Sequence, residues 1–398
     1  MTTNGRPNGA RPAPRVVMVL PAYFPETFGG AEHQTRRFAQ ALARRGVSVT
    51  MLAPRLKGGT PSREEEGPVL VRRFRLRAAP NLGGRHFDSF AWWCLCICSW
   101  LWRNRRRYDL IYVVHGRLHA FPATLAGRGL HKPVVVKPGR GGEVSFDLSV
   151  VRRKRLLGSF FARSIARNTT AWVANSKEIA ADLMHWGVPS ERVHAIPNGV
   201  EIPDDEEQRS GNGVVQFVSM GRLEVEKAVD QTIRAFAGLP ADARAHLTIL
   251  GDGPCRPALE ALSRRLAQES RIAFTGAVGD VTPYLNEADV YVSTSGSEGM
   301  SNALLEAMSR AVMPVVSRVS GVDELVEEGV SGLLFPPGDE TALARRLELS
   351  LAMTAERRRA TGEAAREAVR DRFALDDVVE RHMTLYRNLT EEAPCPRA

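Results

Sequence analysis

The sequence predicts an α/β protein with two doubly wound, parallel-sheet domains. The chain has 398 residues, which is enough for two domains with separate cores. Its 43% hydrophobic and 25% charged residues are typical of globular proteins. Short apolar runs alternate with stretches of helical spacing along the chain, as in parallel sheets covered by helices. A polar segment with glycines, 199–213, separates two such series and predicts a linker.

The first domain is expected over residues 15–198. Residues 16–20 form an apolar run typical of a buried strand, and residues 32–45 continue with helical spacing up to Gly46. Residues 47–52 then form a second strand, so the chain opens as a β-α-β unit. Further strands are expected at 110–114, 134–137, 171–174 and 194–196.

The second domain is expected over residues 214–374, where strands again alternate with helices. An amphipathic helix, 375–392, is expected to close the chain. Residues 1–14 are rich in Gly, Pro and Arg and predict a disordered tail without a secretory signal. This tail and five scattered or crowded cysteines predict a cytoplasmic protein. The strands expected in the second domain are 214–220, 246–250, 272–274, 290–293 and 314–317.

Charge is distributed unevenly along the chain. Residues 1–200 hold 32 Lys and Arg against 12 Asp and Glu, whereas residues 201–398 hold 22 against 33. Such a cationic body could attract nucleic acid, an anionic membrane surface or an acidic acceptor. The chain has no zinc-finger, RNP-like or basic-zipper pattern, so no nucleic acid is expected as a partner. A membrane surface and a charged acceptor remain as possible partners.

Residues 87–102 combine four tryptophans with aliphatic side chains, and a basic cluster follows at 103–107. As a helix this segment would rise about 24 Å, too little for the roughly 30 Å of a bilayer core, so it is not expected to span a membrane. One interpretation is a core helix of the first domain. The other is an interfacial helix, with Trp at the headgroup level and Arg on anionic lipid. In that case 87–107 would bind peripherally to the inner face of the membrane.

An anion site is expected at the turn that follows the strand 290–293. The turn leads into a helix that Ser301 or Asn302 can cap, so its free N–H groups and dipole favour a phosphate there. Two carboxylates flank this site. Glu298 on the turn could face a sugar, and Glu306, more than one helical turn further on, could reach a ribose.

Five motifs resemble those of a known family and occur in the family's order. The run from Glu298 to Glu306 resembles the E-x7-E signature of retaining glycosyltransferases of family four. Residues 221–227 resemble its G-R-L-x-x-x-K donor-phosphate segment, and residues 247–254 resemble its L-x-I-x-G-x-G-P strand and turn. Residues 196–200 are similar to its I-P-N-G-V hinge, and residues 29–32 to its first glycine loop.

The resemblance implies two Rossmann-like domains that face each other across a cleft, an arrangement called GT-B. The C-terminal domain would hold a nucleotide-diphosphate sugar, such as a UDP- or GDP-sugar. The N-terminal domain would receive an acceptor hydroxyl on a glycan, a glycolipid or a small natural product, and the final helix would pack back onto it. The enzyme would be a retaining, hexosyltransferase-like glycosyltransferase that needs no metal or other cofactor.

The loop after the strand 134–137 departs from the family's pattern. Many relatives have a histidine there that touches the sugar, whereas this chain has a glycine-rich stretch in which Arg140 could take that place. His115 and His119, after the preceding strand, are the other candidates, and which of the three faces the sugar stays open. A second departure lies at 309–314, where relatives usually have a glycine and a shorter link, remote from the phosphate.

The resemblance also implies roles for residues that match its motifs. Arg222 and Lys227 would stabilise the negative charge that develops on the leaving diphosphate. Gly29 and Gly30 would let the backbone approach the donor phosphate or the acceptor. The expected catalytic residues are Glu298, Arg222, Lys227, Arg140 and His115. The expected donor contacts are Gly29, Gly30, Arg222, Lys227, Gly299, Met300, Ser301, Asn302 and Glu306.

Protein cations and a helix terminus would make a metal unnecessary, and no Asp-x-Asp pair stands at an expected strand end. The acceptor hydroxyl would attack from the face that the leaving group departs, and a phosphate oxygen would take its proton. A sugar-nucleotide epimerase or phosphorylase of the same architecture remains an alternative. A non-catalytic membrane-bound scaffold is disfavoured, because Glu298, Glu306, Arg222 and Lys227 are all present. A dinucleotide-dependent oxidoreductase is less well supported, because no G-x-G-x-x-G follows the first strand. The donor, acceptor and oligomeric state stay open.

Overall fold

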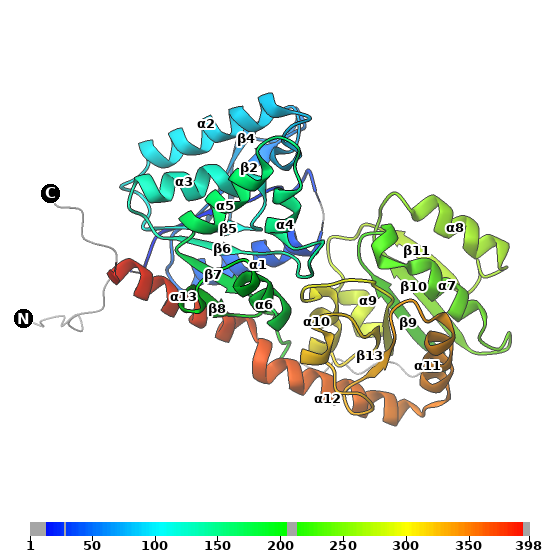
Figure 1. Cartoon of the computed structure of the whole chain (residues 1–398). Coiled ribbons are helices and arrows are strands. Elements are labelled where there is room, and N and C mark those ends of the chain that lie inside the picture. The colour runs from blue at the N-terminus through cyan, green and yellow to red at the C-terminus, as the bar shows by residue number, and fades with distance from the viewer. Residues whose placement is uncertain (1–12, 28, 205–212, 393–398) are drawn as a thin grey trace, which may run out of the picture.

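The structure is a computed structural model that describes residues 13–27, 29–204 and 213–392. Its strands form two sheets, each covered by helices on both faces, as the sequence predicts (Figure 1). Residues 1–12 of the expected tail and residues 205–212 of the expected linker lie outside the described residues.

The first lobe is built on an eight-stranded sheet in the order β3-β4-β2-β1-β5-β6-β7-β8. All neighbouring strands are parallel except β3 and β4, which are antiparallel. The expected strands are confirmed, although the second runs over 49–55 instead of 47–52 and the last is shifted by one residue. β3 was missed because all of its residues are charged, and β4 because arginines interrupt its apolar run. The strands are β1 (Val16–Val19), β2 (Val49–Arg55), β3 (Arg63–Glu66), β4 (Val69–Arg75), β5 (Leu110–Val114), β6 (Val134–Lys137), β7 (Ala171–Ala174) and β8 (Val193–Ala195).

Helices cover both faces of this sheet, and side chains of β1 alternate between the two cores. Val16 and Met18 belong to one core, and Val17 and Val19 to the other. Both faces of the strand are buried, which explains its continuous apolar run. One face carries α1 (Gly30–Arg44) and α13 (Leu375–Glu392); the other carries α2 (Phe87–Arg103), α3 (Phe121–Gly129), α4 (Asp147–Arg152), α5 (Gly158–Asn168) and α6 (Lys177–His185).

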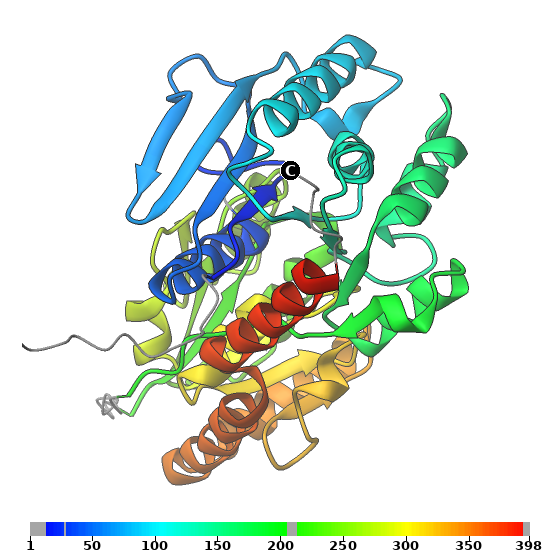
Figure 2. The same ribbon diagram turned by 90° about the vertical axis from the view of Figure 1, so that its left-hand side faces the viewer.

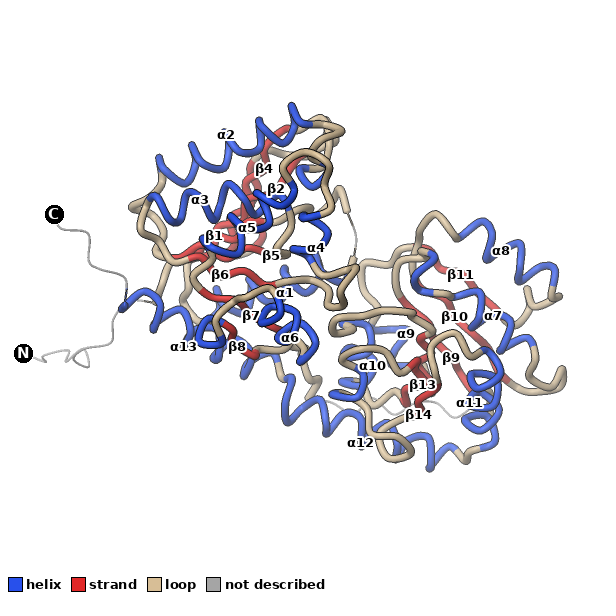
Figure 3. Tube along the Cα trace, viewed as in Figure 1, coloured by secondary structure: helices blue, strands red, loops and turns tan. Residues whose placement is uncertain are grey.

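The second lobe is built on a six-stranded, all-parallel sheet in the order β11-β10-β9-β12-β13-β14 (Figure 3). Its strands are β9 (Val215–Met220), β10 (Ala245–Leu250), β11 (Ile272–Gly276), β12 (Val290–Ser293), β13 (Met313–Ser317) and β14 (Leu333–Phe335), of which only β14 was not expected. One face carries α7 (Val229–Ala237), α8 (Arg256–Arg265) and α11 (Glu340–Ala352); the other carries α9 (Thr282–Glu287), α10 (Asn302–Ser309) and α12 (Ala355–Phe373). Short 3-10 helices are η1 (Pro80–Leu82), η2 (Leu118–Ala120), η3 (Ser190–Arg192), η4 (Val225–Lys227) and η5 (Val322–Glu324).

The chain crosses between the lobes twice, and the two crossings pair with each other. Val200 accepts a hydrogen bond from the Leu375 N–H and donates one to the Phe373 carbonyl, each 2.9 Å long. After this bridge α13 returns to the first lobe and lies beside α1, where Figure 2 shows it in red next to the blue helix. Its residues Val379 and Tyr386 are fully buried in the first-lobe core.

Helix α2 has a buried face, as expected of a core helix, and an exposed apolar face, as expected of an interfacial helix. Trp93 and Ile97 are fully buried in the core of the first lobe. On its outer side, Trp92 is 54% exposed, Leu95 64% and Trp102 58%. Among the described residues no helix combines the length and the apolar composition needed to cross a bilayer.

In both sheets the strand order reverses beside a central strand, β1 in the first lobe and β9 in the second. Ligands of open parallel sheets bind outside the carboxyl ends of the strands at such reversals. The segments that follow β1 and β9 are therefore the places where the fold favours a binding site.

Candidate functional site

The turn after β9 carries Arg222 and is pressed against a second glycine turn. A Cβ on Gly251 would lie 1.9 Å from the Gly221 carbonyl oxygen, so a side chain at position 251 would push the two turns apart. The Leu223 N–H donates to the Asp252 carbonyl over 2.9 Å. The turn at 251–254 therefore supports the backbone of the turn at 221–223, which presents Arg222.

Lys227 ends the 3-10 helix η4 and is held by the turn that follows β12. The Thr294 hydroxyl is 2.9 Å from the Lys227 carbonyl, and the Gly296 N–H donates to the Glu226 carbonyl over 2.9 Å. These bonds fix the two loops against each other at the carboxyl ends of β9 and β12.

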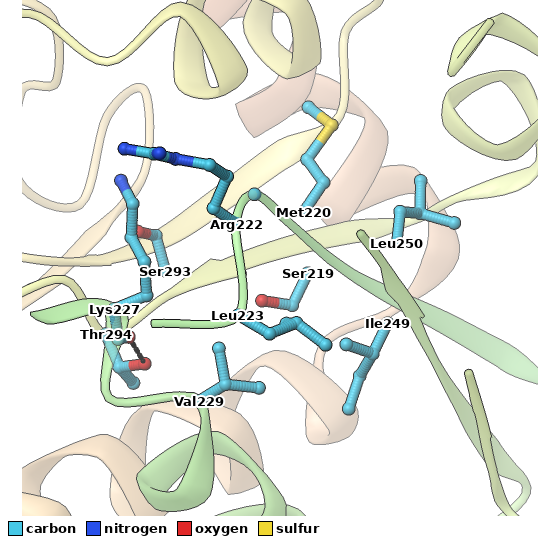
Figure 4. Close-up of a pocket in the computed structure, with 11 residues that line it drawn as sticks. Ser219, Met220, Arg222, Leu223, Lys227, Val229, Ile249, Leu250, Ser293 and Thr294 are labelled. Carbon is cyan, nitrogen blue, oxygen red and sulfur yellow. Dashed lines mark hydrogen bonds between the residues drawn. The ribbon is translucent and has the colours of Figure 1, made fainter. Parts of the chain in front are cut away.

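Arg222 and Lys227 lie at one pocket, whose other walls come from β9, β10 and β12. Figure 4 shows the nitrogen ends of both side chains pointing to the same side of this pocket. Lys227 forms an ion pair with Glu298. Arg222 is 56% exposed and lies 3.2 Å from a carboxylate oxygen of Glu224. Both cations are thus paired with carboxylates in this structure.

The start of α10 faces the first lobe. Of the two expected caps, Ser301 is the N-cap, because its hydroxyl accepts the Leu304 N–H over 3.4 Å. The side chain of Asn302 donates to the Gly30 carbonyl over 2.9 Å and accepts from the Asn198 side chain over 2.7 Å. The N-termini of α1 and α10 therefore meet through Asn302.

The first glycine loop faces Arg222. A Cβ on Gly29, the N-cap of α1, would lie 4.0 Å from Cδ of Arg222, and a Cβ on Gly30 would lie 3.4 Å from Nδ2 of Asn302. The N-terminus of α1 thus approaches Arg222, and the N-terminus of α10 lies beside it at Asn302. The free N–H groups of helix N-termini attract negative charge.

Glu306 lies further along α10, where it forms an ion pair with Arg37 of α1. Both side chains are mostly buried, with 18% of Glu306 and 29% of Arg37 exposed. The sequence predicts Glu306 as a ribose contact but gives no sign of its partner, which lies 269 residues away in the chain.

The loop after β6 reaches the second lobe. Arg140 forms an ion pair with Glu226, next to Lys227. A Cβ on Gly299 would lie 3.0 Å from the Gly139 carbonyl oxygen, so the loop also touches the turn before α10. Arg140 is therefore close to the other expected residues.

The two histidines after β5 differ in their surroundings. His119 is fully buried and satisfied, with Nδ1 2.9 Å from Asn81 Oδ1 and Nε2 2.8 Å from the Val114 carbonyl. Burial lowers its pKa to about 3. It is a structural residue of the lobe's interior and does not face the cleft. His115 lines a pocket between the lobes and stays a candidate, together with Arg140.

Asp147 organises the loops that carry these candidates. It is fully buried and accepts hydrogen bonds from the N–H groups of Gly116, over 2.7 Å, and Gly139, over 2.9 Å. The guanidinium of Arg117 donates to it over 2.9 Å, and Nδ1 of His115 lies 3.8 Å away. Burial favours its neutral form, but the charges of His115 and Arg117 and the Gly139 N–H hold the pKa below its usual value.

The structure brings most of the expected residues to one region between the lobes. Glu306 points toward α1 instead of into the Arg222 pocket, and His119 is separate. The sequence analysis missed Arg37, Asp147 and Asn175, whose positions follow from packing and have no local pattern. Within the described chain, no group of three or more His, Cys, Asp or Glu side chains is suited to a metal ion.

Two family models match the chain, one on each lobe. Residues 29–199 match the model described as glycosyl transferase 4-like domain, and residues 215–352 match the model described as glycosyl transferases group 1. Each model covers the lobe that carries its motifs.

Two curated relatives are 31% identical to this chain over the aligned parts. One is the N-acetyl-alpha-D-glucosaminyl L-malate synthase of Bacillus anthracis, aligned over 166 residues that make up 42% of this chain and 43% of the relative's length. The other is the lipopolysaccharide core biosynthesis glycosyltransferase LpsE of Rhizobium meliloti (strain 1021), aligned over 231 residues, 54% of this chain and 67% of the relative.

A solved structure with a similar fold is that of Anabaena Alr3699/HepE in complex with UDP. It has a TM-score of 0.72 and 18% identity, and the match covers 94% of this chain and 100% of that chain. At this identity the likeness concerns the fold of both lobes.

Proposed function

The chain belongs to the group 1 glycosyltransferases of the GT-B fold, and on this basis we propose that it transfers a hexose from a nucleotide-diphosphate sugar to an acceptor hydroxyl with retention and without a metal. One observation carries this proposal. Arg222 and Lys227 stand at the carboxyl end of β9, and the N-terminus of α1 approaches Arg222 and meets that of α10 at Asn302. Two cations and two helix termini suit a diphosphate.

The donor's diphosphate would lie against Arg222 and Lys227, with the backbone of the turn before α10 beside it. Glu298 would turn from Lys227 to a sugar hydroxyl when the phosphates take over the ammonium group. Gly299, Met300, Ser301 and Asn302 would supply the backbone of the phosphate site, and Gly29 and Gly30 would close it from the first lobe. Glu306 would accept from the ribose. The relative in complex with UDP supports a uridine donor, and a GDP-sugar stays the alternative.

Cleavage of the bond between the anomeric carbon and the diphosphate leaves negative charge on the leaving phosphate. Arg222 and Lys227 would stabilise that charge, which is the task a metal has in other enzymes. Retention follows if the acceptor hydroxyl enters on the face that the diphosphate leaves and gives its proton to a phosphate oxygen. Arg140 and His115, on the acceptor side, would contact the sugar.

The donor can be identified from protection against thermal unfolding. We expect one of UDP-, GDP- or ADP-glucose and their epimers to raise Tm, since ligand at one hundred times its Kd adds about 2.7 kcal/mol. Arg222→Ala should abolish this shift. Arg359→Ala, an exposed arginine on α12, is the matched control and should keep it. Protection that is equal in all three proteins would argue against the site.

Product analysis tests the reaction itself. A glycosyltransferase releases nucleoside diphosphate and forms a glycoside only when the acceptor is present, and NMR of the product gives the anomeric configuration. An isomerised donor without acceptor would indicate an epimerase, and release of a sugar 1-phosphate with inorganic phosphate would indicate a phosphorylase. A product with inverted configuration would reject retention.

We also propose that the first lobe docks peripherally on an anionic membrane through residues 87–107. The outer face of α2 exposes Trp92, Leu95 and Trp102, and the arginines at 103 and 105–107 are exposed at its end. Aromatic side chains favour the headgroup region, and arginines favour anionic lipid. Such docking on the inner face of the membrane would bring a glycolipid acceptor to the cleft.

Liposome co-sedimentation tests this docking. The protein should sediment with vesicles that contain 30% phosphatidylglycerol and stay in the supernatant with pure phosphatidylcholine. The double variant Trp92→Ser and Trp102→Ser should lose binding. Trp92 and Trp102 are more than half exposed, so their removal should leave the fold intact. Equal recovery in the supernatant with both lipids would reject the interfacial helix.

A further inference from the structure

A second pocket lies beside the Arg222 site, between the two lobes. Its empty space, including the solvent at its open mouth, amounts to about 510 Å³. Its walls come from α1, from the ends of β5, β6 and β7, and from Asn198 on the crossing segment. Met300 and Asn302 close it from the second lobe. A molecule in this pocket would therefore contact both lobes.

The pocket contains a polar atom that has no partner among the described residues. Asn175 uses its Nδ2 to donate to Asn198 over 3.3 Å, but its Oδ1 is buried and has no hydrogen-bond partner in the described chain. Nδ1 of His115 also lacks a hydrogen bond there, but it packs against Gly139 and lies 3.8 Å from the Asp147 carboxylate. Buried polar atoms are nearly always paired in folded proteins, so the Oδ1 atom of Asn175 indicates a polar molecule bound beside it.

Lys137, at the end of β6, gives the pocket its charge. No Asp or Glu is among the described residues that line it, and in the part of the chain that the structure describes the Lys137 ammonium has no ion-pair partner. Burial lowers the pKa of Lys137 to about 8, so most of it stays protonated at pH 7. The titratable neighbours His115 and His382 have pKa values lowered by burial, which favours their neutral forms.

The pocket adjoins the expected donor site. Asn302, which starts α10, also forms its wall, and Gly139, next to Arg140, forms another. A hydroxyl group at this end of the pocket would face the sugar of a donor bound at Arg222 and Lys227. An uncompensated ammonium group inside a partly buried pocket favours an anion over a neutral molecule.

We propose that this pocket holds the acceptor, and that the acceptor carries a carboxylate or a phosphate that pairs with Lys137 beside the hydroxyl that is glycosylated. This inference rests on the proposed function and names its acceptor class. In the transfer, the hydroxyl oxygen forms the bond to the anomeric carbon while the bond from that carbon to the diphosphate breaks. The bonding electrons leave with the nucleoside diphosphate, and the hydroxyl proton passes to its phosphate oxygen.

Three probes of similar size test the acceptor class: glycerate, glycerol 3-phosphate and glycerol. Their Kd values would be measured by calorimetry with saturating nucleoside diphosphate. Wild type should bind at least one of the two anions about 10- to 100-fold more tightly than glycerol. The better anion identifies carboxylate or phosphate as the preferred group. Lys137→Met should remove this preference, and Lys137→Arg should keep part of it.

Lys57→Met is the matched control, because Lys57 is exposed on the loop after β2. It should bind all three probes as wild type does. Equal affinity for the three probes, or a preference for anions that persists in Lys137→Met, would overturn the inference. The donor screen stays a separate readout. If a nucleotide sugar protects Lys137→Met as well as wild type while anions show no preference, only the acceptor assignment fails; if no nucleotide sugar protects wild type, the proposed function fails.

Discussion

Arg37 and Glu306 form an ion pair that joins α1 of the first lobe to α10 of the second. The two helices lie on different sheets, and each begins beside the expected phosphate site. Glu306 therefore has a partner on the other lobe. The Glu306 carboxylate can thus have two roles. It can hold the lobes together through Arg37, or it can bind the ribose of the donor.

Substitutions at these two positions distinguish the roles. Glu306→Gln should raise the KM for the donor about tenfold, because a hydrogen bond from the ribose to a charged group is worth about 1.5 kcal/mol or more. Arg37→Gln should change the donor KM less than about threefold, while both variants lower Tm by a similar amount. Steady-state kinetics and thermal unfolding give these values. Equal losses of donor affinity would assign the effect to lobe closure.

Lys227 should be required for the chemical step. Lys227→Met removes an ammonium group from the expected leaving phosphate and should lower kcat by about 100- to 1,000-fold, as deletion of one stabilising donor does elsewhere. It also leaves Glu298 without its ion-pair partner. Single-turnover kinetics with saturating donor would measure the loss. Lys57→Met serves as the control, and an unchanged kcat in Lys227→Met would remove Lys227 from the mechanism.

Gly139 should be needed for the position of His115. A Cβ at residue 139 would lie 1.8 Å from Nδ1 of His115, so Gly139→Ala must displace the imidazole. Transfer to the acceptor should fall by about tenfold or more, because a small misplacement of site groups can cost up to about 100-fold. Thermal protection by the donor should persist. Gly129→Ala, at a site with no atom near the added Cβ, is the control. Normal transfer in Gly139→Ala would exclude a role for His115.

Lys137 should lower stability at neutral pH. Its pKa falls from 10.5 to about 8 in the fold, so the unfolded chain binds the proton more strongly. This destabilisation is complete below about pH 8 and disappears as the pH rises past 10.5. Lys137→Met should therefore be more stable than wild type at pH 7, and the difference should shrink by pH 10. Urea unfolding at both values measures it. A less stable variant at pH 7 would contradict the unpaired state of Lys137.

Replacing Ala311 with glycine should raise the free energy of unfolding. It follows α10 with a φ of 54°, in the left-handed region that costs a residue with a Cβ about 1 to 2 kcal/mol. Glycine relieves this strain but loses about 0.5 to 1 kcal/mol of backbone entropy, so Ala311→Gly should gain up to about 1 kcal/mol. Chemical denaturation measures the change, and activity should not change. A loss of stability would show that the alanine methyl group makes contacts that outweigh the strain.

Local patterns accounted for most of the fold. Continuous apolar runs such as Val16–Val19 predict strands that are buried on both faces, and the structure has them. The strands β3 and β4 were not predicted, because both carry exposed, charged side chains near the edge of the sheet. The motif residues around β9 and α10 were predicted as well, since the proposed phosphate site needs glycines, cations and a helix start at short spacing; their role stays a prediction.

The sequence by itself determined the two-sheet architecture, the family and the residues expected to bind the donor phosphates, because each of these depends on neighbours within a few positions. Only the tertiary structure decided that Glu306 pairs with Arg37, that Asp147 holds the loop of Gly139, and that Lys137, in a pocket between the lobes, has no ion-pair partner among the described residues. Side chains that are distant in the chain meet through the packing of whole lobes. No local pattern encodes that packing, so their partners, burial and charge could be known only from the fold.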